Sequence, residues 1–183
     1  MLFCLLFFKK ENWALSVNLI NSKLYSKNMK IRKAQIKDLK EIDEIYMEGQ
    51  IYEEKKKVHK KNKKEILVDL NKSRKDRLNG FKETIQSPKS KILVCEENKK
   101  IIAFGNATLG NKKRGAEISL IYVRTKYHKK GIGSKILNEL LKYLKREGES
   151  KVYATIDDTN KASIKLNKKA GFKRVAIFME KKL

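Results

Sequence analysis

Two glycines and several basic side chains follow one another where the sequence pattern changes. An apolar run ends at Val123, residues 124–130 are polar and basic, and Gly131-Ile132-Gly133 then begins a helical pattern. The first turn of a helix has backbone N–H groups without intrahelical partners, and the helix dipole adds positive potential there. Glycines let a phosphate approach the backbone, and Lys129 and Lys130 add charge. The segment from His128 to Ser134 therefore predicts an anion site suited to a diphosphate.

Taken by itself this loop is a weak signal, because a glycine-tolerant helix start that binds nothing has the same sequence. Residue 136 is isoleucine, so the third glycine of the dinucleotide fingerprint is missing. The Gly-Lys-Ser/Thr ending of a triphosphate-binding loop is missing as well. The loop alone leaves both interpretations open.

The elements that must position this loop are predicted by the spacing of apolar residues and by turn residues. They follow the order β-α-α-β-β-β-α-β-α-β, and close spacing of the three central strands predicts an antiparallel meander. The expected strands are 30–34, 92–95, 101–109, 117–123, 151–157 and 172–179, and the expected helices begin near Asp38 and cover 66–85, 131–146 and 160–170.

The fold class expected from this order is mixed α/β (α+β) with a single central mixed sheet. A strand, a crossover helix and a second strand predict parallel pairing of 117–123 with 151–157. We expect one domain over residues 29–183. Residues 1–28 show no period and no motif, so we expect an N-terminal extension that is either not native or poorly ordered. The intact mass of the native protein tests whether Met29 is the natural start.

The formal net charge of +24 favours anionic partners, although a genome-wide bias toward lysine would give the same total. A nucleic-acid binder would need a concentrated basic face, and the chain has no recognisable reading helix. Two cysteines and two histidines lie far apart, which argues against a metal site. The apolar residues 1–8 are too short to span a bilayer and lack the charge order of a secretory signal. We therefore expect a cytoplasmic protein without membrane attachment.

Two blocks of residues follow one another in the second half of the sequence. Ile121-Tyr122-Val123 is followed by HKKGIG (residues 128–133), and NKAS (160–163) is followed by LNKKAGF (166–172). These blocks resemble the GNAT superfamily of N-acetyltransferases. The family's first block is a strand and an Arg/Gln-x-x-Gly-x-Gly/Ala loop, and its second block is Asn-x-x-Ala/Ser and then Leu-Tyr-x-Lys-x-Gly-Phe. The order of elements also fits, so the resemblance extends over about residues 29–183.

This resemblance implies a sheet of the GNAT acyltransferase type. It also implies transfer of an acetyl group from acetyl-coenzyme A directly to an amine of a protein, peptide or small molecule, without a metal. The strand end would pair with the pantetheine arm, the loop amides would bind the diphosphate, and Asn160 would lie near the pantetheine or the amine. The implied cofactor-binding residues are Tyr122, Val123, His128, Lys129, Lys130, Gly131, Ile132, Gly133, Ser134 and Asn160.

Two positions depart from the family pattern. His128 replaces the usual Arg or Gln at the head of the loop, where the contacts are largely with the backbone. Asn167 replaces the Tyr that often protonates the leaving thiolate, and an amide cannot act as a general acid. Ser163 and Tyr153 are conceivable substitutes. The second departure leaves an alternative open, namely a module that binds acetyl-coenzyme A with weak or no catalysis.

The candidate general base is Glu117, because family members often use a carboxylate on this strand. Strand alternation predicts that Glu117 shares a face with residues 119, 121 and 123, and an exposed edge glutamate is the competing interpretation. The lysines between Glu53 and Lys64 disfavour polyamines and aminoglycosides as acceptors. An acidic peptide, a protein N-terminus in an acidic context or an amino-acid-like amine fits better. The sequence leaves the oligomeric state open, a homodimer included.

Overall fold

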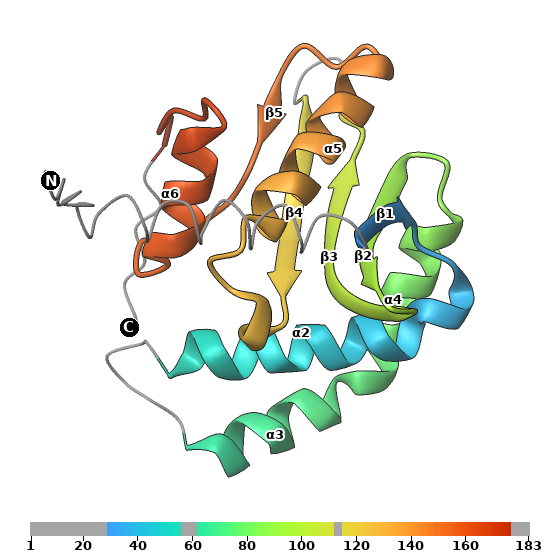
Figure 1. Cartoon of the computed structure of the whole chain (residues 1–183), viewed down its shortest axis with the longest axis vertical. Helices are drawn as coiled ribbons and strands as arrows, with labels where there is room; N and C mark the ends of the chain where they lie inside the picture. The colour runs from blue at the N-terminus through green and yellow to red at the C-terminus, as the bar shows by residue number, and fades with distance from the viewer. Residues whose placement is uncertain (1–28, 56–61, 112–114, 177–183) are drawn as a thin grey trace, which may run out of the picture.

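One mixed sheet of five strands lies at the centre of the computed structural model, which describes residues 29–55, 62–111 and 115–176 (Figure 1). The order across the sheet is β1-β2-β3-β4-β5. The first three neighbouring pairs are antiparallel, and β4 runs parallel to β5. The predicted meander and parallel crossover are therefore confirmed. The strands are β1 Met29–Lys33, β2 Ser90–Glu97, β3 Lys100–Thr108, β4 Ala116–Val123 and β5 Val152–Tyr153.

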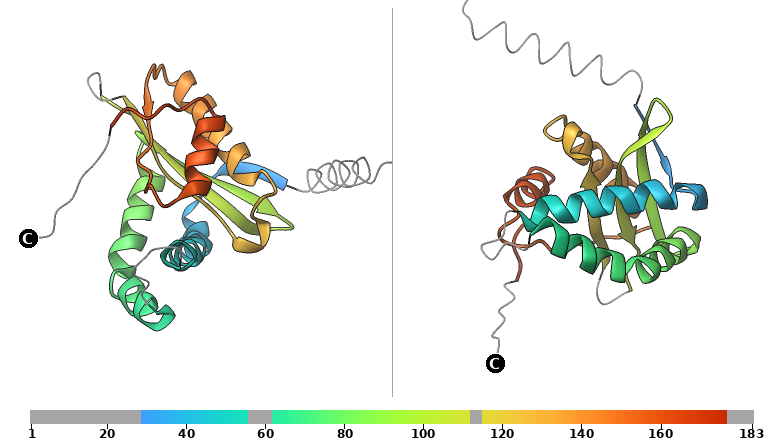
Figure 2. Two further views of the ribbon diagram at one scale, coloured as in Figure 1. Left: turned by 90° about the vertical axis from the view of Figure 1, so that its left-hand side faces the viewer. Right: turned by 90° about the horizontal axis from the view of Figure 1, so that it is seen from below.

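Helices cover both faces of this sheet, as Figure 2 shows from two further sides. Helices α5 and α6 lie on one face, α2 and α4 lie on the other, and α3 runs alongside α2. Each face has its own apolar core, one built around α5 and the other around α2 and α4. The helices are η1 Ile36–Asp38, α2 Leu39–Glu54, α3 Lys63–Lys72, α4 Arg74–Gln86, η2 Thr125–Tyr127, α5 Ile132–Arg146 and α6 Lys161–Lys169.

Helix α5 is held firmly because five apolar residues recur at helical spacing and face the sheet. Ile132, Ile136, Leu137, Leu140 and Leu144 are at most 1% exposed. Full burial of one such side chain contributes about 2 kcal/mol relative to exposure. Two basic residues in the last turn complement the negative end of the helix dipole. This packing holds the start of α5 beside the end of β4.

The helix expected over 66–85 is two helices, which corrects the predicted order to three helices before β2. The break is at Ser73, whose ψ of 6° is not helical. Its cause is tertiary, since Arg74 and Arg77 both bind the fully buried Asp43 of α2, with nitrogen–oxygen distances of 2.9 and 2.7 Å. The guanidinium of Arg77 also donates to the carbonyl of Leu70 at 2.9 Å. These bonds hold α4 against α2. The axis of α4 therefore differs from that of α3, and the helix breaks between them.

The C-terminal part of the chain also differs from expectation. Strand β5 comprises only Val152–Tyr153, where 151–157 was expected, because β4 and β5 diverge after two residue pairs. Of the expected strand 172–179, residues 172–176 have no strand geometry, and the remainder lies outside the described residues. The expected extension 1–28 lies outside them as well. None of the described helices is both long and apolar enough to cross a bilayer.

A bulge in β4 overturns the predicted alternation along this strand. Asn106 of β3 faces Leu120, whereas Ala107 faces Ile118, so Ser119 is one extra residue in β4. The side chains of Ile118, Ile121 and Val123 all join the core around α5, and those of Leu120 and Tyr122 join the core around α2. Glu117 therefore points to the α2 side. The expectation that it shares a face with residues 121 and 123 is wrong.

Candidate functional site

The site begins at an open strand edge at the end of β4. Beyond the pair of Glu117 with Tyr153, β4 has no register partner in β5 among the described residues. Arg124 N donates to the Ile102 carbonyl of β3 at 2.9 Å. Because backbone groups alternate in direction along an antiparallel pair, those of Val123 point away from β3 toward the open side. The same alternation directs the backbone of Tyr122 to β3.

The predicted loop leads from this edge into α5. The ring of His128 contacts the end of β4, with Nε2 lying 2.8 Å from the carbonyl oxygen of Val123. Lys129 and Gly131 have φ angles of 62° and 77°, which turn the chain into the helix. The hydrogen bond from Lys135 N to Gly131 O, at 3.1 Å, closes the first turn of α5.

This geometry leaves three consecutive amides, those of residues 132–134, without a partner inside the helix. Their donors and the dipole of α5 give the loop the properties of an anion site. The packing also leaves room here, because a Cβ on Gly133 would meet only ordinary contacts, the nearest at 3.6 Å from Leu166 Cδ2. The expected diphosphate donors therefore lie next to the open edge of β4.

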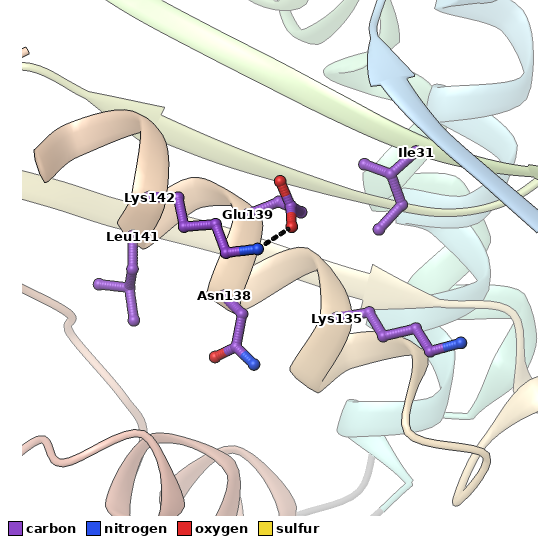
Figure 3. Close-up of a pocket in the computed structure, with 6 residues that line it drawn as sticks. All are labelled: Ile31, Lys135, Asn138, Glu139, Leu141 and Lys142. Atoms are coloured by element: carbon purple, nitrogen blue, oxygen red, sulfur yellow. Dashed lines mark hydrogen bonds and ion pairs between the residues drawn. The ribbon is translucent and has the colours of Figure 1, made fainter. Parts of the chain in front are cut away.

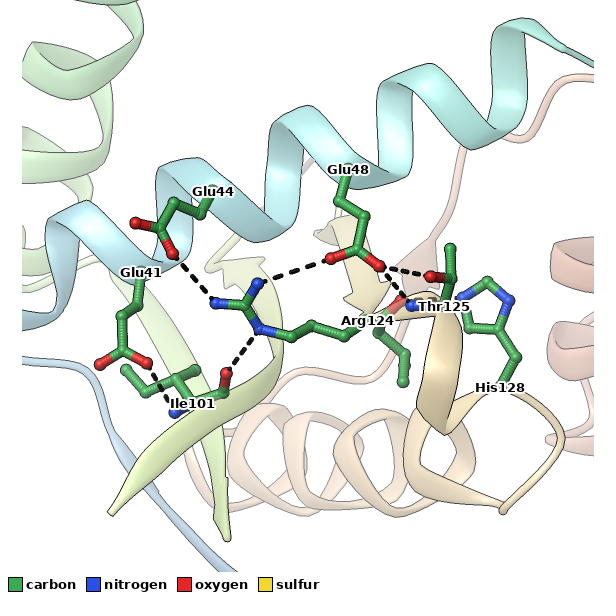
Figure 4. Close-up of polar contacts among 8 residues, drawn as sticks. Glu41, Glu44, Glu48, Ile101, Arg124, Thr125 and His128 are labelled. Carbon is green, nitrogen blue, oxygen red and sulfur yellow. Dashed lines mark hydrogen bonds and ion pairs between the residues drawn. The ribbon is translucent and has the colours of Figure 1, made fainter. Parts of the chain in front are cut away.

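Two glutamates of α2 hold the start of the loop, and a third contacts the neighbouring strand β3 (Figure 4). The Arg124 guanidinium donates to Glu48 at 3.5 Å, to Glu44 at 3.2 Å and to the carbonyl of Ile101 at 3.0 Å. The backbone N and the hydroxyl of Thr125 both donate to Oε1 of Glu48 at 2.6 Å. The third glutamate, Glu41, accepts from Ile101 N at 2.9 Å. These contacts fix the loop relative to α2 as well as to the sheet.

The electrostatics of Glu48 reflect this role. Partial burial opposes ionisation of its carboxyl group, but the hydrogen bonds from Thr125 and the charge of Arg124 outweigh burial. They hold the pKa of Glu48 below its ordinary value. The carboxylate is therefore charged at neutral pH and remains an acceptor for the loop.

A second polar group joins α2, β4 and the start of α6. The Tyr122 hydroxyl donates to Glu53 Oε2 at 3.1 Å and accepts from the amide of Gln50 at 2.6 Å. The amide of Asn160 donates to the other oxygen, Glu53 Oε1, at 2.9 Å. Burial, followed by the neighbouring charge of Glu53, raises the pKa of Tyr122. The phenol is therefore neutral and remains a hydrogen-bond donor.

Sequence reasoning missed Gln50 and Glu53 as site residues and assigned Glu53 to an exposed, lysine-rich segment. The spacing of Gln50 and Glu53 could have indicated that they act together, because residues three apart on a helix lie on the same face. Asn160, which was predicted, is the N-cap of α6, and its Oδ1 accepts from Ser163 N at 3.1 Å. Its side-chain amide therefore connects α6 to the end of α2.

Asn167, at the position of the family tyrosine, is buried inside α6. It is 6% exposed, and its Nδ2 donates to the carbonyl of Ser163 at 3.0 Å. Its Oδ1 has no hydrogen-bond partner among the described residues. Tyr153, considered as a substitute acid, lies beside Glu117 on the paired strands and is 38% exposed. The described residues thus give Asn167 a helix-internal amide bond and no proton to donate.

The structure places most of the predicted site residues close together, but not the candidate base. Tyr122, Val123, His128 and Asn160 lie around the end of β4, next to the first turn of α5. Glu117 lies apart, at the opposite end of the strand, and its side chain is exposed. Lys130 Nζ lies 5.0 Å from the ring centre of Tyr127. In the described part of the chain, no group of three or more His, Cys, Asp or Glu side chains could hold a metal ion.

A separate hollow of about 420 Å³ lies along α5 near β1 (Figure 3). None of the predicted site residues lines it, and its outer wall carries an exposed ion pair between Lys142 and Glu139 at 2.8 Å. Its lining residues are Ile31, Lys135, Asn138, Glu139, Leu141 and Lys142. This hollow therefore does not belong to the site at the end of β4.

Comparison with known proteins agrees with this geometry. Solved structures with the same fold include the PaiA N-acetyltransferase of Thermoplasma acidophilum in complex with coenzyme A, with a TM-score of 0.67. It is 21% identical, and the match covers 79% of this chain and 89% of that one. An N-acetyltransferase of Staphylococcus aureus Mu50 is 29% identical, with a TM-score of 0.63 and coverage of 82% and 86%.

Among curated proteins, an uncharacterized N-acetyltransferase of Methanocaldococcus jannaschii is 29% identical over 97 residues. That match spans 50% of this chain and 43% of the relative, so this chain corresponds to less than half of that protein. The family model described as "Acetyltransferase (GNAT) family" matches residues 50–172. Because this match covers well over half of the sequence and includes the loop, the strand edge and α6, the chain belongs to the GNAT family of acetyltransferases.

Proposed function

We propose that this chain transfers the acetyl group of acetyl-coenzyme A directly to an amine. The observation that carries the proposal is the open edge of β4 at Val123, which leads into the unpartnered amides at the start of α5. An extended ligand with amide groups can add to such an edge in the way a peptide strand does. The diphosphate of the same ligand suits the helix start behind it.

The proposed cofactor contacts follow from this placement. Val123 offers backbone groups to the pantetheine arm, and the neighbouring Tyr122 fixes the strand through its side chain. The free amides of residues 132–134 bind the diphosphate, and Lys129 and Lys130 add positive charge near them. The amide of His128 does not take part, because it donates to the carbonyl of Thr125 at 3.1 Å. Asn160 lies at the start of α6, close to where the arm would pass between β4 and α6.

For the chemical step we propose Glu117 as the general base. Its exposed carboxylate is on the α2 side of β4, at the residue pair after which β4 and β5 separate. This position is open to an amine that approaches the strand gap from the α2 side. A free thiol has a pKa of about 8.5, so the coenzyme A thiolate can leave near neutral pH and take a proton from water.

A second candidate is a module that binds acetyl-coenzyme A with little or no transfer. The observation that favours it is Asn167, a buried amide bonded within α6 where the family usually has tyrosine. General acid catalysis contributes about 10²–10⁴-fold to a rate. A chain without this acid would therefore be slow unless another group replaces it.

Calorimetry with acetyl-coenzyme A, followed by an acetylation screen of amines and peptides, tests both candidates. Transferase function predicts binding together with turnover, and a Glu117→Gln variant that binds normally but turns over about 10²-fold more slowly. Glu139→Gln, on the outer side of α5, is the matched control and should change neither the affinity for acetyl-coenzyme A nor the turnover rate. Binding without turnover on any amine supports the second candidate, and no binding excludes both.

A further inference from the structure

We infer that Glu53 binds the ammonium group of the acceptor, and that the acceptor is an amine carrying a neighbouring anionic group. This inference rests on the proposed transferase function and gives its acceptor site a location and a chemical class. The location is the polar group formed by Glu53, Tyr122, Gln50 and Asn160 at the end of α2.

The Glu53 carboxylate is held in one orientation from both sides. Tyr122 donates to Oε2 from the strand, and Asn160 donates to Oε1 from the start of α6. A carboxylate accepts about four hydrogen bonds, two on each oxygen. Glu53 is half-buried, so each oxygen keeps capacity for a further donor and the group remains reachable from solvent. An ammonium group supplies three donors and a full positive charge, which matches this remaining capacity.

The position of Glu53 suits an acceptor rather than the coenzyme. Its partner Tyr122 points to the α2 side of β4, while Val123 directs its side chain toward α5 and its backbone toward the open edge. An amine held at Glu53 therefore approaches the strand edge from the face opposite α5. The same face of β4 carries Glu117, but at the opposite end of the strand. An ammonium bound at Glu53 therefore has to move along this face before Glu117 can take its proton.

The charge around Glu53 argues for the class of acceptor. Glu53 is followed by the exposed Lys55, and α3 begins with the exposed Lys63 and Lys64. Figures 1 and 2 show that the start of α3 lies beside the end of α2. Glu53 and the adjacent Glu54 thus lie beside lysines, and this mixture of charges favours a molecule with one ammonium and one nearby anion. An amino acid or the N-terminus of an acidic peptide has this arrangement, whereas a polyamine does not.

The alternative explanation is that Glu53 only connects α2, β4 and α6. Glu53→Gln separates the two roles, because a glutamine can accept from Asn160 with its oxygen and donate to the Tyr122 hydroxyl with its amide. The connection then survives while the charge that would bind an ammonium is removed. Glu139→Gln again serves as the charge-matched control on the other face of the sheet.

The experiment measures steady-state acetylation of the dipeptide Ala-Asp, with spermidine as the opposing probe. We expect Glu53→Gln to raise KM for Ala-Asp at least tenfold, to keep kcat within about threefold and to leave coenzyme A affinity unchanged. Wild-type protein should prefer Ala-Asp over spermidine by at least tenfold in kcat/KM. An unchanged KM, a parallel loss of coenzyme A affinity or a preference for spermidine would each overturn the inference.

Failure of the proposed function gives a different result. A wild-type chain that binds coenzyme A but acetylates no amine still allows the ammonium site to be tested by calorimetry with Ala-Asp on the coenzyme A-saturated protein. Glu53→Gln should weaken that binding at least tenfold. If Ala-Asp binds equally well to both proteins, or does not bind to the wild type, the inference is wrong whatever the catalytic activity.

Discussion

His128 Nε2 lies 2.8 Å from the carbonyl oxygen of Val123, so the head of the loop is bonded to the strand edge that precedes it. A carbonyl only accepts hydrogen bonds, which means that Nε2 carries the proton in this contact. The ring also packs edge-on against Tyr52 of α2, with centroids 4.8 Å apart. The loop is therefore held in place before any ligand binds, because strand and helix both contact the same imidazole.

His128→Ala should weaken coenzyme A binding by about three- to tenfold. The loss corresponds to one net hydrogen bond of about 1 kcal/mol that preorganises the loop. Isothermal calorimetry measures it, and His128→Gln, which keeps a donor, is the matched control and should lose less. Tighter binding by His128→Ala would show that the imidazole competes with the ligand for Val123.

Two glycines of the loop should behave differently when replaced by alanine. Gly131 has a φ of 77°, and this region costs an L-residue about 1–2 kcal/mol, so Gly131→Ala should lower the free energy of unfolding by that amount. An added Cβ at Gly133 meets only ordinary contacts, so Gly133→Ala should have the same free energy of unfolding as the wild type. Urea denaturation of both variants checks this contrast. Equal destabilisation would contradict the assignment of a left-handed backbone to Gly131 and not to Gly133.

Gly49 is required because the ring of Tyr122 packs directly on α2. A Cβ at this position would lie 2.2 Å from Tyr122 Cδ1, although alanine is otherwise the better helix former by about 1 kcal/mol. Gly49→Ala should therefore displace the ring, break its bond to Glu53 and lower stability by about 1–3 kcal/mol. Gly80→Ala, on α4 with open space at its Cβ, is the control and should gain stability. A neutral effect of Gly49→Ala in thermal unfolding would contradict the tight packing.

These positions show which features the sequence predicts and which it hides. The loop, α5 and the parallel crossover depend on local spacing, and they were predictable. The bulge at Ser119 inserts a residue without any glycine or proline, so strict alternation placed Glu117 on the wrong face. The break at Ser73 follows from a buried carboxylate on another helix, Asp43, which no local pattern reveals.

The polar group at the end of α2 was also hidden, for a related reason. Glu53 and Asn160 are 107 residues apart in the sequence and meet only because the end of α2 and the start of α6 both lie beside β4. Asn160 was identified through a family motif, whereas Glu53 belongs to a segment whose lysines predicted only exposure. Contacts between distant segments depend on tertiary packing, and composition carries no information about them.

Glu48 should make the stability of the chain sensitive to acid. Its folded pKa is below the ordinary value, so the stability it contributes is present above the unfolded pKa and is lost as pH falls through the folded pKa. Glu48→Gln should cost about 1 kcal/mol at pH 7, a value reduced for partial exposure of the group. The difference from wild type should shrink as the pH is lowered toward 3. Urea unfolding at several pH values measures it, and a constant difference would exclude ionisation as the cause.

Cys95 should be inert toward thiol reagents while the chain is folded. Its side chain is fully buried in β2, and burial raises the pKa of the thiol to about 11. Only the thiolate is nucleophilic, so both low ionisation and lack of access slow the reaction at pH 8. In a Cys4→Ser background, which leaves Cys95 as the one cysteine of the sequence, an aromatic disulfide reagent should react at least 100-fold faster in 6 M guanidinium than in buffer. A fast reaction of the native protein would show that β2 opens locally, because the core around α5 must separate from the sheet before the reagent can reach the sulfur.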